Sequence, residues 1–250
     1  MIRPLLMDCV RSCVFALLGC SLALACGEPA SSTETASASS SASSFVAKDL
    51  LDSVALAHGY DHWAQVDAVS FDFVVSTADT VRSQRTWQWY PRTDSVVLEA
   101  PDQETVRYRR AQLSQIGEDD PVVQADRAFI NDTYWLLMPY YLVWSREGFD
   151  ASIARNVQMP LSGEPATRVT IQYQREGGYT PGDAYDLFVD GDLMLREWAF
   201  RRAGTAEPNL VTSWEGYSDM NGIKVPARHE APGGALLITH GEVNVQVARR

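Results

Sequence analysis

The sequence predicts an α+β fold, in which a curved antiparallel sheet forms an open half-barrel and a few helices cover its concave face. Apolar and polar residues alternate over many short runs, a pattern typical of half-buried strands. Asp190-Gly191-Asp192 and Asn221-Gly222 separate such runs and are strong hairpin signals. Helical spacing occurs mainly in early segments. Because roughly ten strands are too many for a flat sheet, we expect the sheet to curl.

The elements follow in order. Residues 49–58 have helical spacing and end at Gly59, where a helix C-terminal cap belongs. Residues 69–75 and 83–90 alternate as strands, and a second helix is expected at 121–130, preceded by the acidic loop 118–120. Further strands are predicted at 94–99, 105–110, 167–174, 185–189, 193–200, 210–217, 223–229 and 236–247.

The first two strands predict the lining of the hollow. If they pair as a hairpin around residues 78–82, one concave surface carries Val69, Phe71, Phe73, Val75, Trp87 and Trp89. The uncharged run Tyr134–Trp144 is too short to span a membrane and is interrupted by Pro139. It is either a buried core element or a lid over an apolar ligand. The candidate ligand-binding residues are Phe71, Phe73, Trp87, Trp89, Trp135, Leu137, Met138 and Tyr140.

The N-terminus predicts a lipid anchor. A weakly basic start with Arg3 and Arg11 precedes 14 uncharged, mostly apolar residues that end directly before Cys26. This pattern resembles the lipobox of bacterial lipoproteins, which implies cleavage before Cys26 and acylation of that residue, with palmitate as a typical chain. Cleavage at Cys20 is the alternative, with a shorter apolar core. The expected organisation is a signal peptide at 1–25, an acylated Cys26 with a tether at 26–44, and one domain at 45–250.

The tether also bears on location. Residues 31–44 contain eight Ser and cannot bury enough apolar surface to fold, so we expect a flexible spacer. Gly27 is not the Asp that retains many lipoproteins at the inner membrane. In a Gram-negative cell, the resemblance therefore implies the outer membrane, with the domain facing the periplasm.

Several classes of chemistry are disfavoured. All four cysteines lie within the first 26 residues, which leaves no cysteine for a zinc site or a nucleophile in the domain. A net charge of −11 disfavours nucleic acid as a partner. Common catalytic spacings are absent, and neither a cofactor nor catalytic residues are expected. His58 and His62 are four residues apart, but Gly59 breaks the helix between them, so no metal site is expected.

Three segments carry a family resemblance. They are Phe129–Tyr140, Thr180–Tyr185, and Trp214–Tyr217 together with Gly222–Pro226. They resemble an uncharacterised family of bacterial lipoproteins that is similar to the lipoprotein localisation factors LolA and LolB. The resemblance covers about residues 49–247. It implies an open antiparallel half-barrel with helices across its mouth, whose relatives hold acyl chains in the hollow.

Three functional hypotheses follow. The first is a membrane-anchored protein that binds or passes on a lipid or acylated molecule without covalent chemistry. The second is a structural or assembly lipoprotein of the envelope whose aromatic side chains fill its own hollow, and the third is a hydrolase that uses acidic residues. A cavity of about 300 Å³ or more would favour binding, whereas close packing would favour the structural role. The sequence leaves the ligand and the oligomeric state open.

Overall fold

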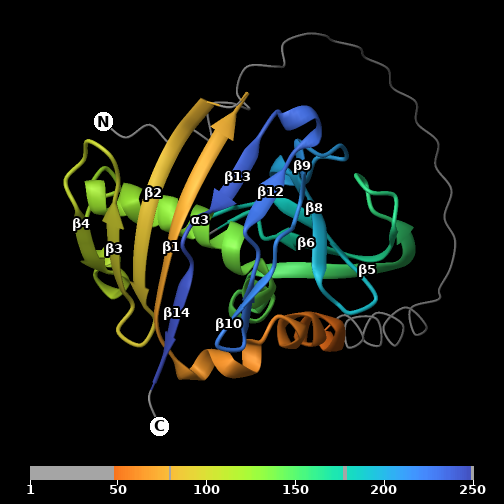
Figure 1. The fold of residues 1–250 in the computed structure, drawn as a ribbon, viewed down its shortest axis with the longest axis horizontal. Coiled ribbons are helices and arrows are strands. Elements are labelled where there is room, and N and C mark those ends of the chain that lie inside the picture. Colours follow the sequence, from red (N-terminus) through yellow and green to blue (C-terminus); the bar gives the residue numbers. More distant parts are fainter. Residues whose placement is uncertain (1–47, 79, 177–178, 249–250) are drawn as a thin grey trace, which may run out of the picture.

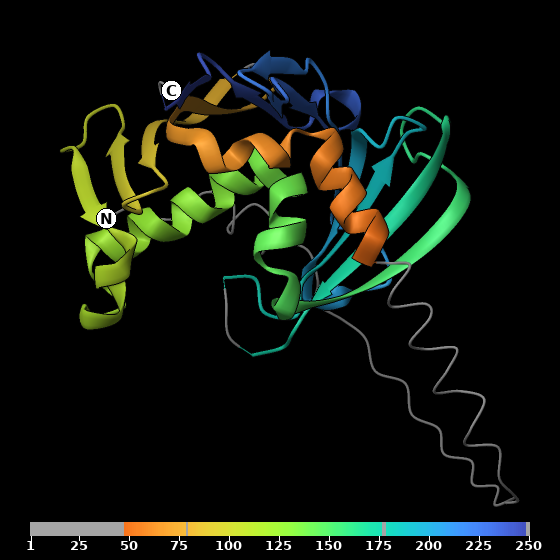
Figure 2. The same ribbon diagram turned by 90° about the horizontal axis from the view of Figure 1, so that it is seen from below.

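A computed structural model describes residues 48–78, 80–176 and 179–248 of the 250-residue chain. The predicted signal peptide, Cys26 and the tether lie outside these residues. Within them, two antiparallel sheets stand at an angle to each other, and the helices lie on the inner side between them (Figure 1, Figure 2). This arrangement places one long helix against both sheets.

The first sheet has seven strands in the order β12-β13-β1-β2-β3-β4, and β14 pairs with β1 beside β13. Its strands are β1 (Val66–Thr77), β2 (Thr80–Tyr90), β3 (Ser95–Glu99), β4 (Val106–Arg109), β12 (Arg228–Glu230), β13 (Leu237–His240) and β14 (Asn244–Val247). We call it the large sheet.

The second sheet has five strands in their sequence order. They are β5 (Phe149–Gln158), β6 (Pro165–Tyr173), β7 (Ala184–Val189), β8 (Leu195–Arg201) and β9 (Leu210–Ser213). We call it the small sheet. After β9, the chain forms the hairpin β10 (Ser218–Met220) and β11 (Ile223–Val225), and it then enters the large sheet at β12.

The helical elements fill the space between the sheets. Residues 48–57 are helical and lead into η1 (Tyr60–Gln65), while α3 (Pro121–Trp144) crosses the inner face of the molecule (Figure 2). Asp120 caps α3, because its side chain accepts a hydrogen bond from the Val122 amide at 2.8 Å. Short 3₁₀ turns complete the fold: η2 (Arg110–Gln115), η3 (Arg146–Gly148), η4 (Arg202–Gly204) and η5 (Pro232–Gly234).

The structure confirms the α+β class, the antiparallel strands and the small number of helices. The expectation of a single curved sheet is not met, because the described strands divide among the large sheet, the small sheet and the β10–β11 hairpin. The described strands likewise form neither a closed nor a strongly curled sheet. The helix expected at 121–130 is longer than predicted, since α3 continues to Trp144 and includes the uncharged run Tyr134–Trp144.

The predicted pairing of the first two strands is confirmed. β1 and β2 pair antiparallel, with Val69 opposite Trp89 and Phe71 opposite Trp87. The six apolar side chains expected on one surface are all buried beneath α3. Phe129 of α3 packs edge-on against Trp87 and Trp89, with ring centroids 5.4 and 5.5 Å away.

A buried ion pair fixes α3 to this surface. Asp132 of α3 is fully buried and accepts hydrogen bonds from Arg85 Nε at 2.6 Å and Arg85 Nη2 at 2.8 Å. Trp87 Nε1 donates to the same carboxylate at 2.8 Å, and Asn131 Nδ2 donates at 3.0 Å. The charge of the Asp132 carboxylate is therefore balanced by the Arg85 guanidinium, and both of its oxygens accept hydrogen bonds inside the apolar core.

We predict that Asp132→Ala lowers the free energy of unfolding by about 3–5 kcal/mol, because it leaves the Arg85 guanidinium and the Trp87 indole without their buried partner. Urea denaturation measures the loss. The control is Glu118→Ala, which breaks an exposed pair with Arg127 at 3.8 Å and should cost less than about 1 kcal/mol. Similar losses for both variants would contradict the assigned role of Asp132.

Candidate functional site

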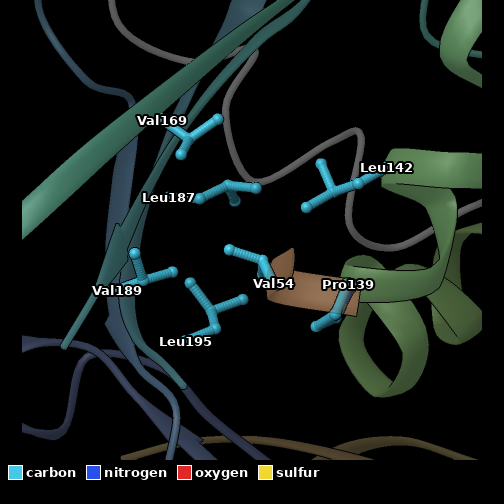
Figure 3. Close-up of a pocket in the computed structure, with 7 residues that line it drawn as sticks. All are labelled: Val54, Pro139, Leu142, Val169, Leu187, Val189 and Leu195. Atoms are coloured by element: carbon cyan, nitrogen blue, oxygen red, sulfur yellow. The ribbon is translucent and has the colours of Figure 1, made fainter. Parts of the chain in front are cut away.

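An apolar seam lies where α3 and the helix at 48–57 face the small sheet. Its lining side chains are Val54, Pro139, Leu142, Val169, Leu187, Val189 and Leu195, all of them hydrocarbon (Figure 3). Val54, Pro139 and Leu142 come from the helices, and the other four come from β6, β7 and β8. Figure 3 shows the two groups facing each other across the seam. We refer to these seven residues as the apolar seam.

The seam is closed in this structure. The side chains around it leave no space that would admit a water molecule, so the cavity volume is about 0 Å³. A small-molecule site has roughly 300 Å³ or more. A dry, apolar space of this kind is available only to hydrocarbon, and only if the helices move away from the sheet.

The helix above the seam has a built-in break. Leu137 has φ −128° and ψ 22°, outside the helical region, and Pro139 follows two residues later. Proline has no amide hydrogen to bond the carbonyl four residues earlier, which explains the break. Tyr141 Oη donates to Thr133 Oγ1 at 2.7 Å and connects the two halves of α3 across it. Residues 138–144 thus form a separate helical segment over the seam.

Two polar contacts hold this segment against the helix at 48–57. Tyr140 Oη donates to the His58 carbonyl at 2.7 Å. Arg146 follows the end of α3, and its Nη2 donates to Asp52 Oδ1 at 2.5 Å while Nε donates to the Leu142 carbonyl at 3.1 Å. The Asp52 side chain is 43% exposed, so this pair is partly screened by water. We call these two contacts the clasp.

The eight candidate ligand-binding residues are all buried, but they do not line the apolar seam. Phe71, Phe73, Trp87 and Trp89 lie on the inner face of the large sheet, where the first half of α3 fills the space. Trp135, Leu137, Met138 and Tyr140 flank the break in α3.

The lining residues of the small sheet were missed by the sequence reasoning. The alternation in 167–174 and 185–189 was visible, and it contains Val169, Leu187 and Val189. Period-2 alternation does not say which face meets a helix from elsewhere in the chain. The missing information was the tertiary pairing of that face with α3.

His58 and His62 have different environments. His58 is buried: its Nδ1 donates to the Val54 carbonyl at 2.8 Å, and its Nε2 accepts from the Leu195 amide at 3.3 Å. His62 lies in η1 with about half of its side chain exposed. Gly59 separates the two with φ 93°, as expected from the sequence. Over the described ranges, no three His, Cys, Asp or Glu residues are grouped so as to hold a metal ion.

Burial lowers the pKa of His58 to about 4, and the nearby Lys224 and Arg196 lower it further, while the hydrogen bond to Val54 partly opposes this. The ring is thus neutral in the folded protein near pH 7. It connects the helix at 48–57 to β8, next to the apolar seam.

A second, more open hollow lies on the opposite face of the large sheet. It has a volume of about 240 Å³, and its lining includes Ser70, Asp72, Gln88, Glu99 and Asn244. Its carboxylates, amides and hydroxyl groups suit water or polar groups rather than hydrocarbon. It is therefore not a candidate for an apolar ligand.

The family models and the curated proteins searched contain no match to this chain. Solved structures do resemble it. A DUF1329 family protein from Desulfovibrio piger aligns at 9% identity with a TM-score of 0.44, covering 83% of this chain and 95% of that one. A LolA superfamily protein from Nitrosomonas europaea aligns at 10% identity with a TM-score of 0.44, covering 81% and 94%.

A domain named for outer membrane lipoprotein sorting, from Vibrio parahaemolyticus, aligns at 8% identity with a TM-score of 0.41, covering 82% and 95%. The structural neighbours thus include LolA superfamily proteins, as the resemblance in the sequence suggested, at low identity. Separately, none of the helices in the described part of the chain is long and apolar enough to cross a membrane.

We predict that His58 makes the protein less stable in mild acid. Its pKa is about 4 when folded and about 6.5 when unfolded, so the unfolded state takes up the proton first. The contribution of His58 is complete above pH 6.5 and falls by about 2 kcal/mol between pH 7.5 and 5. Urea denaturation at several pH values measures the loss, and His58→Gln should remove that part of the pH dependence.

His62→Gln is the matched control, because the His62 ring is already about half exposed to water when the protein is folded. It should leave the pH dependence of unfolding as in the wild type. An unchanged pH dependence in His58→Gln would show that His58 does not carry this effect.

Proposed function

We propose that this chain is a membrane-anchored lipoprotein of the cell envelope that binds or passes on an apolar chain, lipid or acylated, at the apolar seam. The observation that carries the proposal is the break in α3 at Leu137, next to a wall made only of Val and Leu side chains. An acyl chain can replace a separate helical segment against such a wall, because the wall side chains then stay buried and little buried apolar area is lost.

In this proposal, residues 138–144 move away from the small sheet, and the ligand takes their place against Val169, Leu187, Val189 and Leu195. The two sheets then act as the walls of an open half-barrel. Burying an acyl chain contributes about 0.8 kcal/mol per CH₂ group, or about 10 kcal/mol for twelve carbons. Part of this free energy is needed to break the clasp and to separate residues 138–144 from the small sheet. The remaining binding free energy is about −8 kcal/mol, which corresponds to micromolar affinity.

The seam also supports binding without covalent chemistry. Its seven lining side chains carry no nucleophile, no acid and no base. The His58 side chain nearby is engaged at both ring nitrogens and neutral near pH 7. We therefore propose a non-catalytic protein in which the ligand is held by shape and by exclusion of water.

The proposed anchor is the acylated Cys26, which places the domain at the periplasmic side of the outer membrane. The tether of residues 27–44 would let the domain approach or leave the lipid surface over roughly 20–25 Å. An apolar ligand taken from that surface would have only a short path through water.

We predict saturable binding of a fluorescent fatty-acid probe, with a dissociation constant in the micromolar range. Leu187→Phe adds volume to the wall of the seam and should weaken binding by about tenfold or more. The matched control is Leu98→Phe, which makes the same change on the buried face of β3 in the large sheet. A folded chain without saturable binding, or equal effects of the two substitutions, would contradict a site at the seam.

The clasp gives a kinetic prediction. Asp52→Asn removes the charge that holds Arg146 and should speed probe association, because the segment at 138–144 opens more often. Stopped-flow fluorescence measures the rate, with Glu118→Gln at an exposed pair as the control. Equal association rates in wild type and Asp52→Asn would show that opening of the clasp does not limit entry.

The closed packing of the seam favours a second candidate function. The described structure leaves no space for water there, so the chain could act as a structural or assembly lipoprotein whose core is filled by its own side chains. The probe experiment separates the two functions, because a protein with this role stays folded and binds no probe.

The anchor is tested separately. We predict that Cys26→Ser abolishes the acyl mass increment and releases the protein from the membrane fraction, because serine cannot accept the thioether-linked lipid. Intact mass and fractionation of cell extracts measure both effects. If Cys26→Ser stays acylated and Cys20→Ser does not, the anchor is Cys20.

A further inference from the structure

Hydrogen bonds join the two sheets where β9 of the small sheet and the residues after it lie beside β12 of the large sheet. The Glu230 amide donates to Ser213 Oγ at 3.1 Å, and the Glu215 amide donates to the Arg228 carbonyl at 3.0 Å. Behind these contacts lies an aromatic cluster that joins both sheets to α3. It consists of Trp135, Trp198, Trp214, His229 and His240, and we call it the junction cluster.

The junction cluster is continuous across the molecule. Trp214 lies between Trp198 of the small sheet, at 5.4 Å, and His229 of the large sheet, at 4.5 Å between ring centroids. His229 lies 5.4 Å from His240. Trp135 of α3 contacts both Trp198, at 4.4 Å, and His229, at 5.2 Å. The aromatic contacts between the two sheets therefore include the imidazole rings of His229 and His240.

Both histidines are almost completely buried, and three of their four ring nitrogens have no hydrogen-bond partner within the described structure. His229 Nδ1 donates to the Ser213 carbonyl at 3.1 Å, which leaves Nε2 as the unprotonated nitrogen. His229 Nε2 and both ring nitrogens of His240 have no hydrogen-bond partner within the described structure. Each ring is thus neutral in a largely aromatic environment, and Phe71 and Phe73 complete the surroundings of His240.

No carboxylate compensates a proton on either ring. Besides burial, the neighbouring His240 lowers the pKa of His229 further, and the carbonyls of Ser213 and Trp135 raise it by less. On His240, only the Pro226 carbonyl opposes the effect of burial. Burial lowers the pKa of both rings, that of His240 to about 3.

The charged groups on the surrounding elements are engaged elsewhere. On β12, Arg228 and Glu230 pair with each other, and on β1, Asp72 accepts from Thr86. On β8, the Glu197 carboxylate accepts hydrogen bonds from the backbone amides of Leu161 and Ser162. Two arginines of the same strand form ion pairs, Arg196 with Asp190 and Arg201 with Asp186. On α3, Asp132 pairs with Arg85. The strands β9 and β13 bring no further charged side chain.

We propose that His229 and His240 form an acid-sensitive latch, whose protonation separates the two sheets at the β9–β12 contact while each sheet keeps its own strand pairing. A proton on either ring places an uncompensated charge in the aromatic cluster, and two protons repel each other as well. Separation admits water to both rings and removes this penalty. The latch is a property of the sheet junction and holds whether or not a ligand binds.

The proposal sets a measurable proton count. If the closed form is neutral at both rings and the open form binds two protons, the opening equilibrium rises up to 100-fold per pH unit below about 6.5. With one titrating histidine, it rises up to tenfold. Both slopes apply between pH 6 and 4.5, above the lowered pKa of His240.

Hydrogen exchange of the full chain, followed by NMR and corrected for intrinsic rates, measures this slope. The reporters are the Glu215 and Glu230 amides, whose bonds cross the junction. The Leu187 amide, in the interior of the small sheet, reports unfolding of that sheet. The expected result is loss of protection at the two junction amides with the two-proton slope, while protection of Leu187 changes much less.

Two variants test the assignment. His240→Phe keeps an aromatic ring beside Phe71 and Phe73, so it should fold and reduce the slope to that of one proton. His58→Gln changes a buried histidine away from the junction and should leave the slope unchanged. A two-proton slope that persists in His240→Phe overturns the proposal, as does equal loss of protection at Leu187.

Discussion

Two buried carboxylates on α3 fix the position of that helix, and the rest of the structure is arranged around it. Asp132 accepts four hydrogen bonds from Arg85, Trp87 and Asn131. Six residues earlier, Asp126 accepts from Tyr108 Oη at 3.1 Å, Arg110 Nε at 2.8 Å, and Tyr179. Because an unpaired buried charge is costly, α3 cannot slide or rotate over the large sheet without losing all of these bonds.

Beyond Asp132, the character of the helix changes. No charged residue follows until Arg146, and the contacts with the small sheet depend on packing of hydrocarbon and aromatic side chains. The break at Leu137 lets this second half take its own direction. One half of α3 is thus held by directional, charged bonds and the other by packing and the clasp. The motion that we propose for ligand entry therefore involves only the second half.

Much of this was predictable where local pattern decides the structure. The β1–β2 pair and the β7–β8 and β10–β11 hairpins follow from alternation and turn residues. β5 was missed because it is an edge strand in which only Phe149 is fully buried, and its alternation stops at a register shift between Ala154 and Val157. The division into two sheets was not predictable, because it depends on which strands pair over long distances in the chain, such as β1 with β13 and β14, rather than on strand propensity.

The candidate site was less predictable than the fold for a related reason. Large aromatic residues such as Phe71 and Trp87 are conspicuous in a sequence, and in the structure both are buried in the core. The residues of the proposed binding surface are ordinary Val and Leu, whose role depends on what covers them. A wall of small aliphatic side chains accepts a helix or an acyl chain with similar loss of exposed apolar area. The choice between the two then depends on a few polar contacts at the edge, here Tyr140 with His58 and Arg146 with Asp52.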